Sequence, residues 1–182
     1  WGIGETHGNS ATAGTNMGNS FVTYVAGTGL RPLDFLTEYD VFATAGADDN
    51  VREQLSSNLT GIAGATVNSL ALHNLSVAAA THLVTGAGAA QSLAVTSGAF
   101  LFTLNPAAVA GDYGITLGGF DGGITVGATN EYVFHVVNPD AATPTKVLTA
   151  TIGSLLTSSA DITKSGRGTL VLTGGNTAGG GA

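Results

Sequence analysis

The feature that most constrains this sequence of 182 residues is a long stretch without charge. No Asp, Glu, Lys or Arg occurs from Gln54 to Gly111, nearly a third of the chain. An ordinary solvated domain covers the outer faces of its helices and strands with charged side chains. Rows of Thr, Ser and Asn can instead cover the outside of stacked β-strands. The stretch therefore favours a stacked β architecture.

The composition excludes several classes of protein. Charged residues make up 9% of the chain and hydrophobic residues 43%, which is the reverse of the pattern of a disordered chain. Five Lys and Arg against 12 Asp and Glu cannot form a phosphate-binding stripe or dock on anionic lipid. The absence of Cys excludes disulfides and thiolate sites. No apolar run approaches the roughly 20 residues of a membrane helix. We therefore expect no nucleic-acid partner and no membrane insertion of this segment.

Short alternating apolar runs from about residue 65 onward predict β-strands. The strand starts at Leu70, Leu93 and Ile115 follow one another at nearly equal intervals. This spacing fits one coil of a parallel β-helix, which takes roughly 20 residues or more. An antiparallel sandwich or a jelly roll is the alternative, but Asp121-Gly122 is the only tight-hairpin dipeptide of its kind. In stacked coils, eight residues should form one interior column: Leu70, Leu93, Leu101, Ile115, Ile124, Val133, Leu148 and Leu170.

The N-terminal third differs from the rest in charge. Six of the 12 acidic residues lie within residues 34–53. Helical turns are expected after Pro32 and again around residues 48–55. We predict an irregular, partly helical leader or cap over residues 1–64, with the acidic window at 34–53, before the coils of residues 65–182.

A sequence motif stands near the C-terminal end. Residues 161–177 read Asp-Ile-Thr-Lys-Ser-Gly-Arg-Gly-Thr-Leu-Val-Leu-Thr-Gly-Gly-Asn-Thr. This segment resembles the autotransporter-associated β-strand repeat, in which a Lys-Ser/Thr-Gly-x-Gly-Thr-Leu core precedes a hydrophobic strand and Gly-x-Asn-Thr. The repeat normally continues with Tyr, where this chain has Ala178. A weaker likeness extends upstream to residues 21–33. The motif residues are Lys164, Gly166, Gly168, Leu170, Leu172 and Asn176.

The resemblance implies a fold and a function. The implied fold is all-β, a right-handed parallel β-helix (solenoid) with an irregular, partly helical N-terminal region. The implied protein is the passenger of a large bacterial surface protein, secreted, extracellular or at the cell surface. It would serve as a non-catalytic stalk, adhesin or fibre subunit. Expected partners are further coils of the same polypeptide or other copies of the chain, and a surface polysaccharide or a host or neighbouring cell surface.

No metal-binding or cofactor motif occurs. The four histidines form no paired spacing. We expect His73 and His82 at polar surface positions, and His135 either pointing outward or satisfied within the core. Asp48, Asp49 and Asn50 are the best oxygen cluster for Ca²⁺. They lack the spacing of an EF-hand loop, so a solvated acidic turn is favoured. We expect no metal and no cofactor.

Two rival functions remain open. A carbohydrate-active enzyme would need paired carboxylates, and the acids near strand ends are Asp112, Asp121 and Glu131. A sugar-binding module would present exposed aromatic residues in a row, for which the candidates are Tyr113, Phe120 and Tyr132. Basic side chains that could hold an acidic sugar are scarce after residue 60. We therefore expect no catalytic residues and no enzyme activity.

Overall fold

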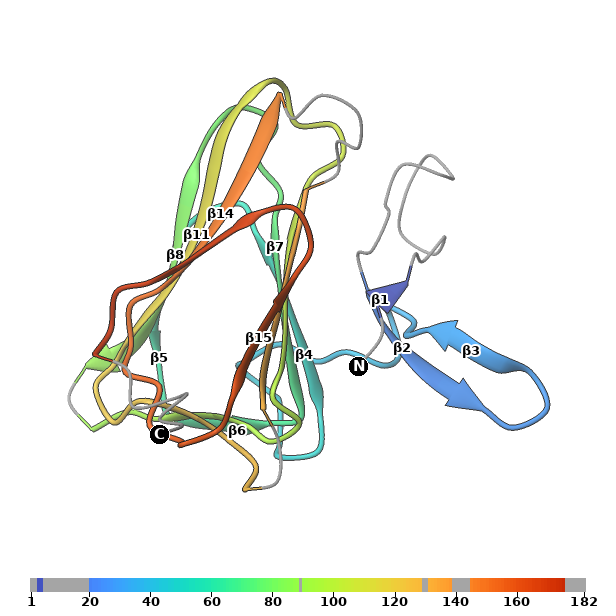
Figure 1. The fold of residues 1–182 in the computed structure, drawn as a ribbon, viewed down its shortest axis with the longest axis vertical. Helices are drawn as coiled ribbons and strands as arrows, with labels where there is room; N and C mark the ends of the chain where they lie inside the picture. The colour runs from blue at the N-terminus through green and yellow to red at the C-terminus, as the bar shows by residue number, and fades with distance from the viewer. Residues whose placement is uncertain (1–2, 5–19, 89, 129–130, 139–144, 176–182) are drawn as a thin grey trace.

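The computed structural model describes residues 3–4, 20–88, 90–128, 131–138 and 145–175, and all the regular elements in these ranges are β-strands. Two five-stranded parallel sheets face each other across the core, and a three-stranded parallel sheet lies across one edge of the pair (Figure 1). A small antiparallel sheet lies outside them. The described part of the chain contains no helix that is long and apolar enough to cross a membrane.

The four sheets are named here by one of their strands. The β7 sheet, in chain order, contains β4 (Asn50–Leu55), β7 (Ser69–Asn74), β10 (Ala99–Leu104), β13 (Tyr132–Val137) and β15 (Ile162–Ser165). The β8 sheet contains β5 (Leu59–Ile62), β8 (Thr81–Gly88), β11 (Gly111–Phe120), β14 (Lys146–Ile152) and β16 (Thr169–Leu172). The short parallel sheet contains β6 (Ala65–Val67), β9 (Leu93–Val95) and β12 (Ile124–Val126). The antiparallel sheet contains β1 (Ile3–Gly4), β2 (Ser20–Val25) and β3 (Gly29–Pro32).

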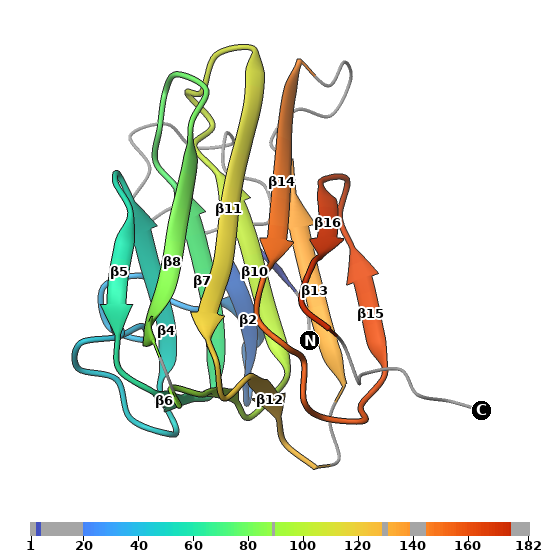
Figure 2. The same ribbon diagram turned by 90° about the vertical axis from the view of Figure 1, so that its left-hand side faces the viewer.

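The chain visits the three parallel sheets repeatedly, so strands far apart in sequence become neighbours. Figure 2 shows β5, β8, β11, β14 and β16 side by side in one sheet. In the β7 sheet, Leu70 pairs with Phe100 and Phe100 pairs with Phe134. Residues that pair in adjacent strands are thus further apart in the sequence than Leu70 and Leu93 are.

This topology corrects the predicted right-handed parallel β-helix (solenoid) with a partly helical N-terminal region. The parallel pairing of strands is confirmed. The strands that begin near Leu70, Leu93 and Ile115 do not stack on one another, however, because each lies in a different sheet. The nearly equal spacing of these three starts is therefore not the length of a coil. The β7 and β8 sheets are open layers stacked face to face, as in a sandwich, and we describe the fold in those terms.

The predicted helices are also absent from the described residues. Asp34 forms a turn in which its Oδ1 accepts a hydrogen bond of 2.8 Å from the N–H of Leu36, and no helix follows. Residues 50–55 form the edge strand β4, in which Val51 lies on the core side and the next residue, Arg52, on the other side. Successive side chains that point to opposite faces are typical of a strand.

The core lies between the sheets and is rich in aromatic side chains. The rings of Phe100 and Phe134 have centroids 4.9 Å apart, and Tyr132 stacks on Phe134. Six of the eight residues predicted for one interior column do contact this core, namely Leu70, Leu93, Ile115, Ile124, Leu148 and, at its margin, Leu170.

The remaining two residues of the predicted column lie elsewhere. Leu101 belongs to a second cluster on the opposite face of the β7 sheet, together with Phe21 and Leu33. Val133 pairs with Ala99, which belongs to the same second cluster. The prediction of a single column is wrong because both faces of the β7 sheet are covered.

The acidic window lies where the regular sheets begin. Residues 34–49 lie outside the named strands, whereas β4 begins at Asn50. Asp40 makes a parallel bridge to Val51: its N–H donates to the carbonyl of Asn50, and its carbonyl accepts from the N–H of Arg52, both at 2.8 Å. This segment covers part of the free edge of β4, which would otherwise present unpaired backbone groups.

Candidate functional site

The structure separates the three oxygen ligands proposed for calcium. Asp49 Oδ2 accepts a hydrogen bond of 2.7 Å from the N–H of Gly46, which closes a turn. Asn50 Oδ1 accepts hydrogen bonds from Asn68 and Ser69 of the next strand layer, at 2.9 and 2.7 Å. Asp48 is exposed. In the described part of the chain, no group of three or more His, Cys, Asp or Glu residues is placed to hold a metal ion.

The C-terminal motif forms the last two strands and the turn between them. Gly166 has a φ of +79°, and a β-carbon there would overlap the backbone carbonyl of Val136. At Gly168 a β-carbon would meet the side chain of the same valine. Lys164 Nζ donates a hydrogen bond of 2.6 Å to the carbonyl of Gly166, which closes the turn on itself. Leu170 and Leu172 pack against the core, and Asn176 lies outside the described residues.

The two histidines expected at the surface are buried, and so is His135. His73 Nδ1 lies 2.7 Å from Thr103 Oγ1, and His135 Nδ1 bonds Ser165 Oγ, each across adjacent strands of the β7 sheet. His82 Nε2 lies 2.7 Å from a hydroxyl oxygen, Oγ of Ser76. The surface prediction for His73 and His82 is therefore wrong. His135 is buried, as in the second alternative, but its Nδ1 has a hydrogen-bond partner and its Nε2 has none.

Burial also sets the charge of these histidines. It lowers the pKa of all three, and that of His73 falls to about 3, with the positive charge of Arg52 as a second cause. They are neutral at pH 7. His73 and His135 form hydrogen bonds between strands, whereas His82 bonds the connection before its own strand. His7 lies outside the described residues.

The candidates for a carbohydrate site are not arranged as one. Tyr113, Phe120 and Tyr132 are all buried in the core, so they form no exposed aromatic row. Asp112, Asp121 and Glu131 are exposed, and Glu131 Oε2 accepts a hydrogen bond of 2.9 Å from Thr163.

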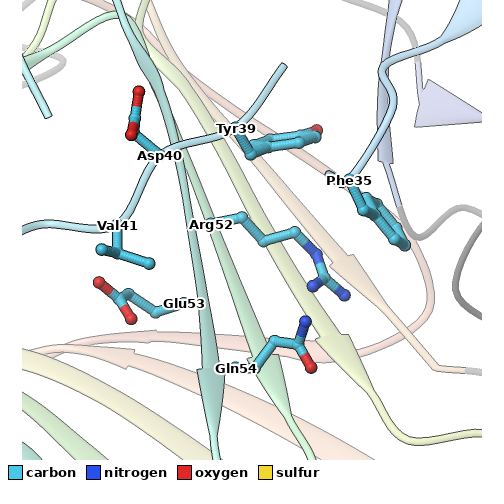
Figure 3. A pocket seen from close by; sticks show the side chains of 7 residues that line it. All are labelled: Phe35, Tyr39, Asp40, Val41, Arg52, Glu53 and Gln54. Carbon is cyan, nitrogen blue, oxygen red and sulfur yellow. The ribbon is translucent and has the colours of Figure 1, made fainter. Parts of the chain in front are cut away.

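A pocket that the sequence did not reveal lies beside the edge strand β4 (Figure 3). Its cavity volume is about 320 Å³. One wall comes from β4 and the other from residues 35–41, the segment that crosses over that strand. The lining residues are Phe35, Tyr39, Asp40, Val41, Arg52, Glu53 and Gln54.

The central group of the pocket is the guanidinium of Arg52. This residue is only 9% exposed, and its Nε is buried without a hydrogen-bond partner. The guanidinium carbon lies 3.9 Å from the centroid of the Phe35 ring, a cation–π contact. Burial lowers the pKa of Arg52 to about 10, whereas the nearby Tyr39 acts in the opposite direction. Arg52 is thus a buried cation that is stacked on an aromatic ring.

Neither carboxylate of the pocket neutralises this cation. Glu53 Oε1 accepts a hydrogen bond of 2.7 Å from the N–H of Phe42, and Asp40 Oδ1 accepts one of 3.2 Å from Thr44. Figure 3 shows both carboxylates pointing away from the guanidinium of Arg52. Burial raises the pKa of Glu53, as expected for a carboxylate without a cationic partner.

The segment that covers Arg52 is fixed by its own contacts. Arg31 Nη2 donates to Glu38 Oε1 at 2.7 Å. The hydroxyl of Tyr39 lies 3.0 Å from Ser20 Oγ and accepts a hydrogen bond of 3.0 Å from the N–H of Phe21. These contacts position Phe35 and Tyr39 over β4. The available sequence signal was an isolated arginine between the apolar residues Val51 and Leu55, but nothing in the sequence paired it with Phe35.

No family model, curated protein or solved structure matches this chain. The likeness of residues 161–177 to the autotransporter-associated repeat therefore rests on the residues of that segment alone.

Proposed function

We propose that this chain is a non-catalytic structural or adhesive segment of a bacterial surface protein, secreted or displayed outside the cell, that is extended by pairing of strands at its β15 and β16 edge. The partner strands belong to a continuation of the same polypeptide or to another copy of it. The resemblance of residues 161–177 to a passenger repeat supports this assignment. The observation that carries it is the difference between the two edges of the β7 sheet.

The β4 edge of that sheet is covered in part, whereas the β15 edge is open. Among the described residues, no segment pairs with the outward edge of β15 or of β16. Tyr132 N–H donates to the carbonyl of Asp161 at 2.8 Å. Because backbone groups alternate in direction along a parallel strand, those of Ile162 and Lys164 face away from β13. An edge of this kind is a template for a further strand.

The outer face of the β8 sheet is compatible with close lateral contact. Two rows of aligned positions run across it, and neither contains a charged residue. They are Thr81, Gly114, Thr149 and Thr169 in the first row, and Leu83, Thr116, Thr151 and Val171 in the second. A neutral surface of this kind offers little electrostatic resistance to a neighbouring chain or to a polysaccharide.

The test compares Lys164→Pro with Lys164→Ala in the 182-residue chain. Proline is tolerated in an edge strand where its nitrogen faces outward, but it removes the donor that a further strand needs. Alanine removes the same side chain and keeps the N–H. Size-exclusion chromatography with light scattering should show concentration-dependent association for the wild type and for Lys164→Ala, and a monomer for Lys164→Pro.

Two results would contradict the proposal. One is a wild-type chain that remains a monomer at high concentration with a protease-resistant C-terminal end. The other is equal association of the proline and alanine variants, which would show that the β15 edge is not the contact. Circular dichroism on both variants verifies that the strands are retained.

A further inference from the structure

We propose that the pocket beside β4 binds a small hydroxylated carboxylate, of the size of a single sugar acid, with Arg52 as the residue that binds the carboxylate. This inference does not depend on the structural role proposed above, because the pocket and the β15 edge lie at opposite edges of the β7 sheet.

The buried guanidinium indicates an anionic ligand. A buried charged group is normally paired and hydrogen-bonded, since burial without a partner is strongly unfavourable. Arg52 is 9% exposed and its Nε has no partner. In the described part of the chain it forms no ion pair with Asp40 or Glu53. A guanidinium offers a planar set of donors that matches the two oxygens of a carboxylate.

The rest of the pocket limits what the anion can carry. A volume of about 320 Å³ lies at the lower end of the range for small-molecule pockets. Asp40 and Glu53 line the same cavity. Two carboxylates disfavour a multiply charged anion such as phosphate, but they accept hydrogen bonds from hydroxyl groups. Gln54 adds an amide that can donate or accept. A ligand with one carboxylate for Arg52 and hydroxyl groups for the neighbouring Gln54 matches the side chains that Figure 3 shows together on this side of β4.

The binding group is held in place before a ligand arrives. Phe35 covers one face of the guanidinium at 3.9 Å, and the Tyr39 hydroxyl is fixed by Ser20 and Phe21. Little side-chain freedom of Arg52 would then be lost on binding, which favours affinity in a small site.

The experiment is a calorimetric titration of the 182-residue chain with four probes. Sodium glucuronate carries both the carboxylate and the hydroxyls, glucose lacks the carboxylate, sodium acetate lacks the hydroxyls, and inorganic phosphate carries more charge. We expect saturable binding of glucuronate, with glucose, acetate and phosphate each weaker by about tenfold or more.

Substitutions then assign the site. Arg52→Met should weaken glucuronate binding by about tenfold or more, because it removes the cation that lines the pocket. Arg167→Met makes the same change of net charge outside the pocket and should leave the affinity unchanged. Arg52→Lys keeps the charge without the planar donor set and should give an intermediate affinity.

Several outcomes would overturn the inference. These are no saturable binding of glucuronate, equal binding of glucose, tighter binding of phosphate than of glucuronate, or equal effects of Arg52→Met and Arg167→Met. If Arg52→Met does not fold, amide chemical shifts of the wild-type chain during the glucuronate titration provide the test. Shifts concentrated at residues 39–41 and 52–54 support the site, and shifts elsewhere refute it.

Discussion

Replacement of Arg52 by methionine should stabilise the ligand-free protein. Burial lowers the pKa of Arg52 from its ordinary value to about 10, and at about 1.4 kcal/mol per pKa unit this corresponds to about 3 kcal/mol against the charged form in the folded state. The cation–π contact with Phe35 offsets about 1 kcal/mol of this. Methionine retains a flexible apolar side chain of similar length. The free energy of unfolding should therefore rise by about 1–2 kcal/mol relative to wild type.

The measurement is urea unfolding at pH 7, followed by circular dichroism, with Arg167→Met as the control. An exposed substitution of this kind should change stability by no more than about 0.5 kcal/mol. The unfavourable contribution of Arg52 to stability also depends on pH. Because the folded-state pKa of Arg52 is lowered, its unfavourable contribution is fully present below about pH 10. It decreases as the pH rises from there toward the ordinary pKa of arginine, since only the unfolded chain still holds the proton. The difference between variant and wild type should narrow in that window.

A loss of stability would refute this reasoning. If Arg52→Met unfolds more easily than wild type by more than about 1 kcal/mol, the guanidinium must have a stabilising partner, as expected for a buried ion pair that loses one member. Arg52 would then be a structural residue, and the argument for a ligand at this position would lose its basis.

Three other perturbations test the core, the turn and the buried histidine. Acidification should destabilise the protein, because burial lowers the pKa of His73 to about 3. The stability that neutral His73 contributes is complete above about pH 6.5 and is lost as the pH falls toward 3. The urea midpoints of His73→Gln should therefore vary less with pH than those of wild type. Gly166→Ala should destabilise the protein more than Gly27→Ala in the same assay. Both glycines have positive φ, but of these two only Gly166 lies where a β-carbon would overlap the backbone. Equal effects would show that strain in φ alone is responsible. Phe100→Ala should lower the free energy of unfolding by about 3–5 kcal/mol, since Phe100 is fully buried and its ring contacts Phe134. Val171→Ala, at an exposed position, should change this free energy little. A small effect of Phe100→Ala would contradict the packed core.

The sequence predicted the strands well and their partners poorly. The apolar runs of residues 100–104, 132–137 and 169–172 are strands, and the parallel pairing is confirmed. The spacing argument failed because strands of all three parallel sheets have similar composition. Strands near Leu70, Leu93 and Ile115 look alike in sequence although they belong to different sheets. Strands pair through backbone hydrogen bonds, which do not depend on the identity of the side chains, so the sequence of such short strands does not indicate their partners.

The burial of His73 and His135 has a related physical cause. A surface position for a histidine in a strand requires one buried and one solvated face, as in an open antiparallel sheet. The β7 sheet is covered on both faces, by the core on one side and by Phe21, Leu33 and Tyr39 on the other. The continuous apolar run of residues 99–102 was the sequence signal for this, because a strand buried on both faces loses its alternation. His73 and His135 then find hydroxyl partners inside the sheet.

The candidate pocket lies where the regular stacking of strands ends. At β4 the next layer is replaced by an irregular segment that satisfies part of the strand edge through Asp40. The side chains of this segment do not repeat those of the strands, and among the described residues none forms an ion pair with Arg52. At the other edge, no described segment pairs with the outward side of β15. The two edges are separated by three intervening strands of the β7 sheet.

Ligand binding at one edge and association at the other should therefore be independent. Lys164→Pro should leave the affinity for glucuronate unchanged, and Arg52→Met should leave the concentration dependence of association unchanged. Calorimetry on the first variant and light scattering on the second measure these quantities. Coupling in either direction, such as glucuronate that dissociates the wild-type assembly, would show that the two sites share an interface. That result would contradict the independence of the two edges, and a second copy against the β4 pocket would account for it directly.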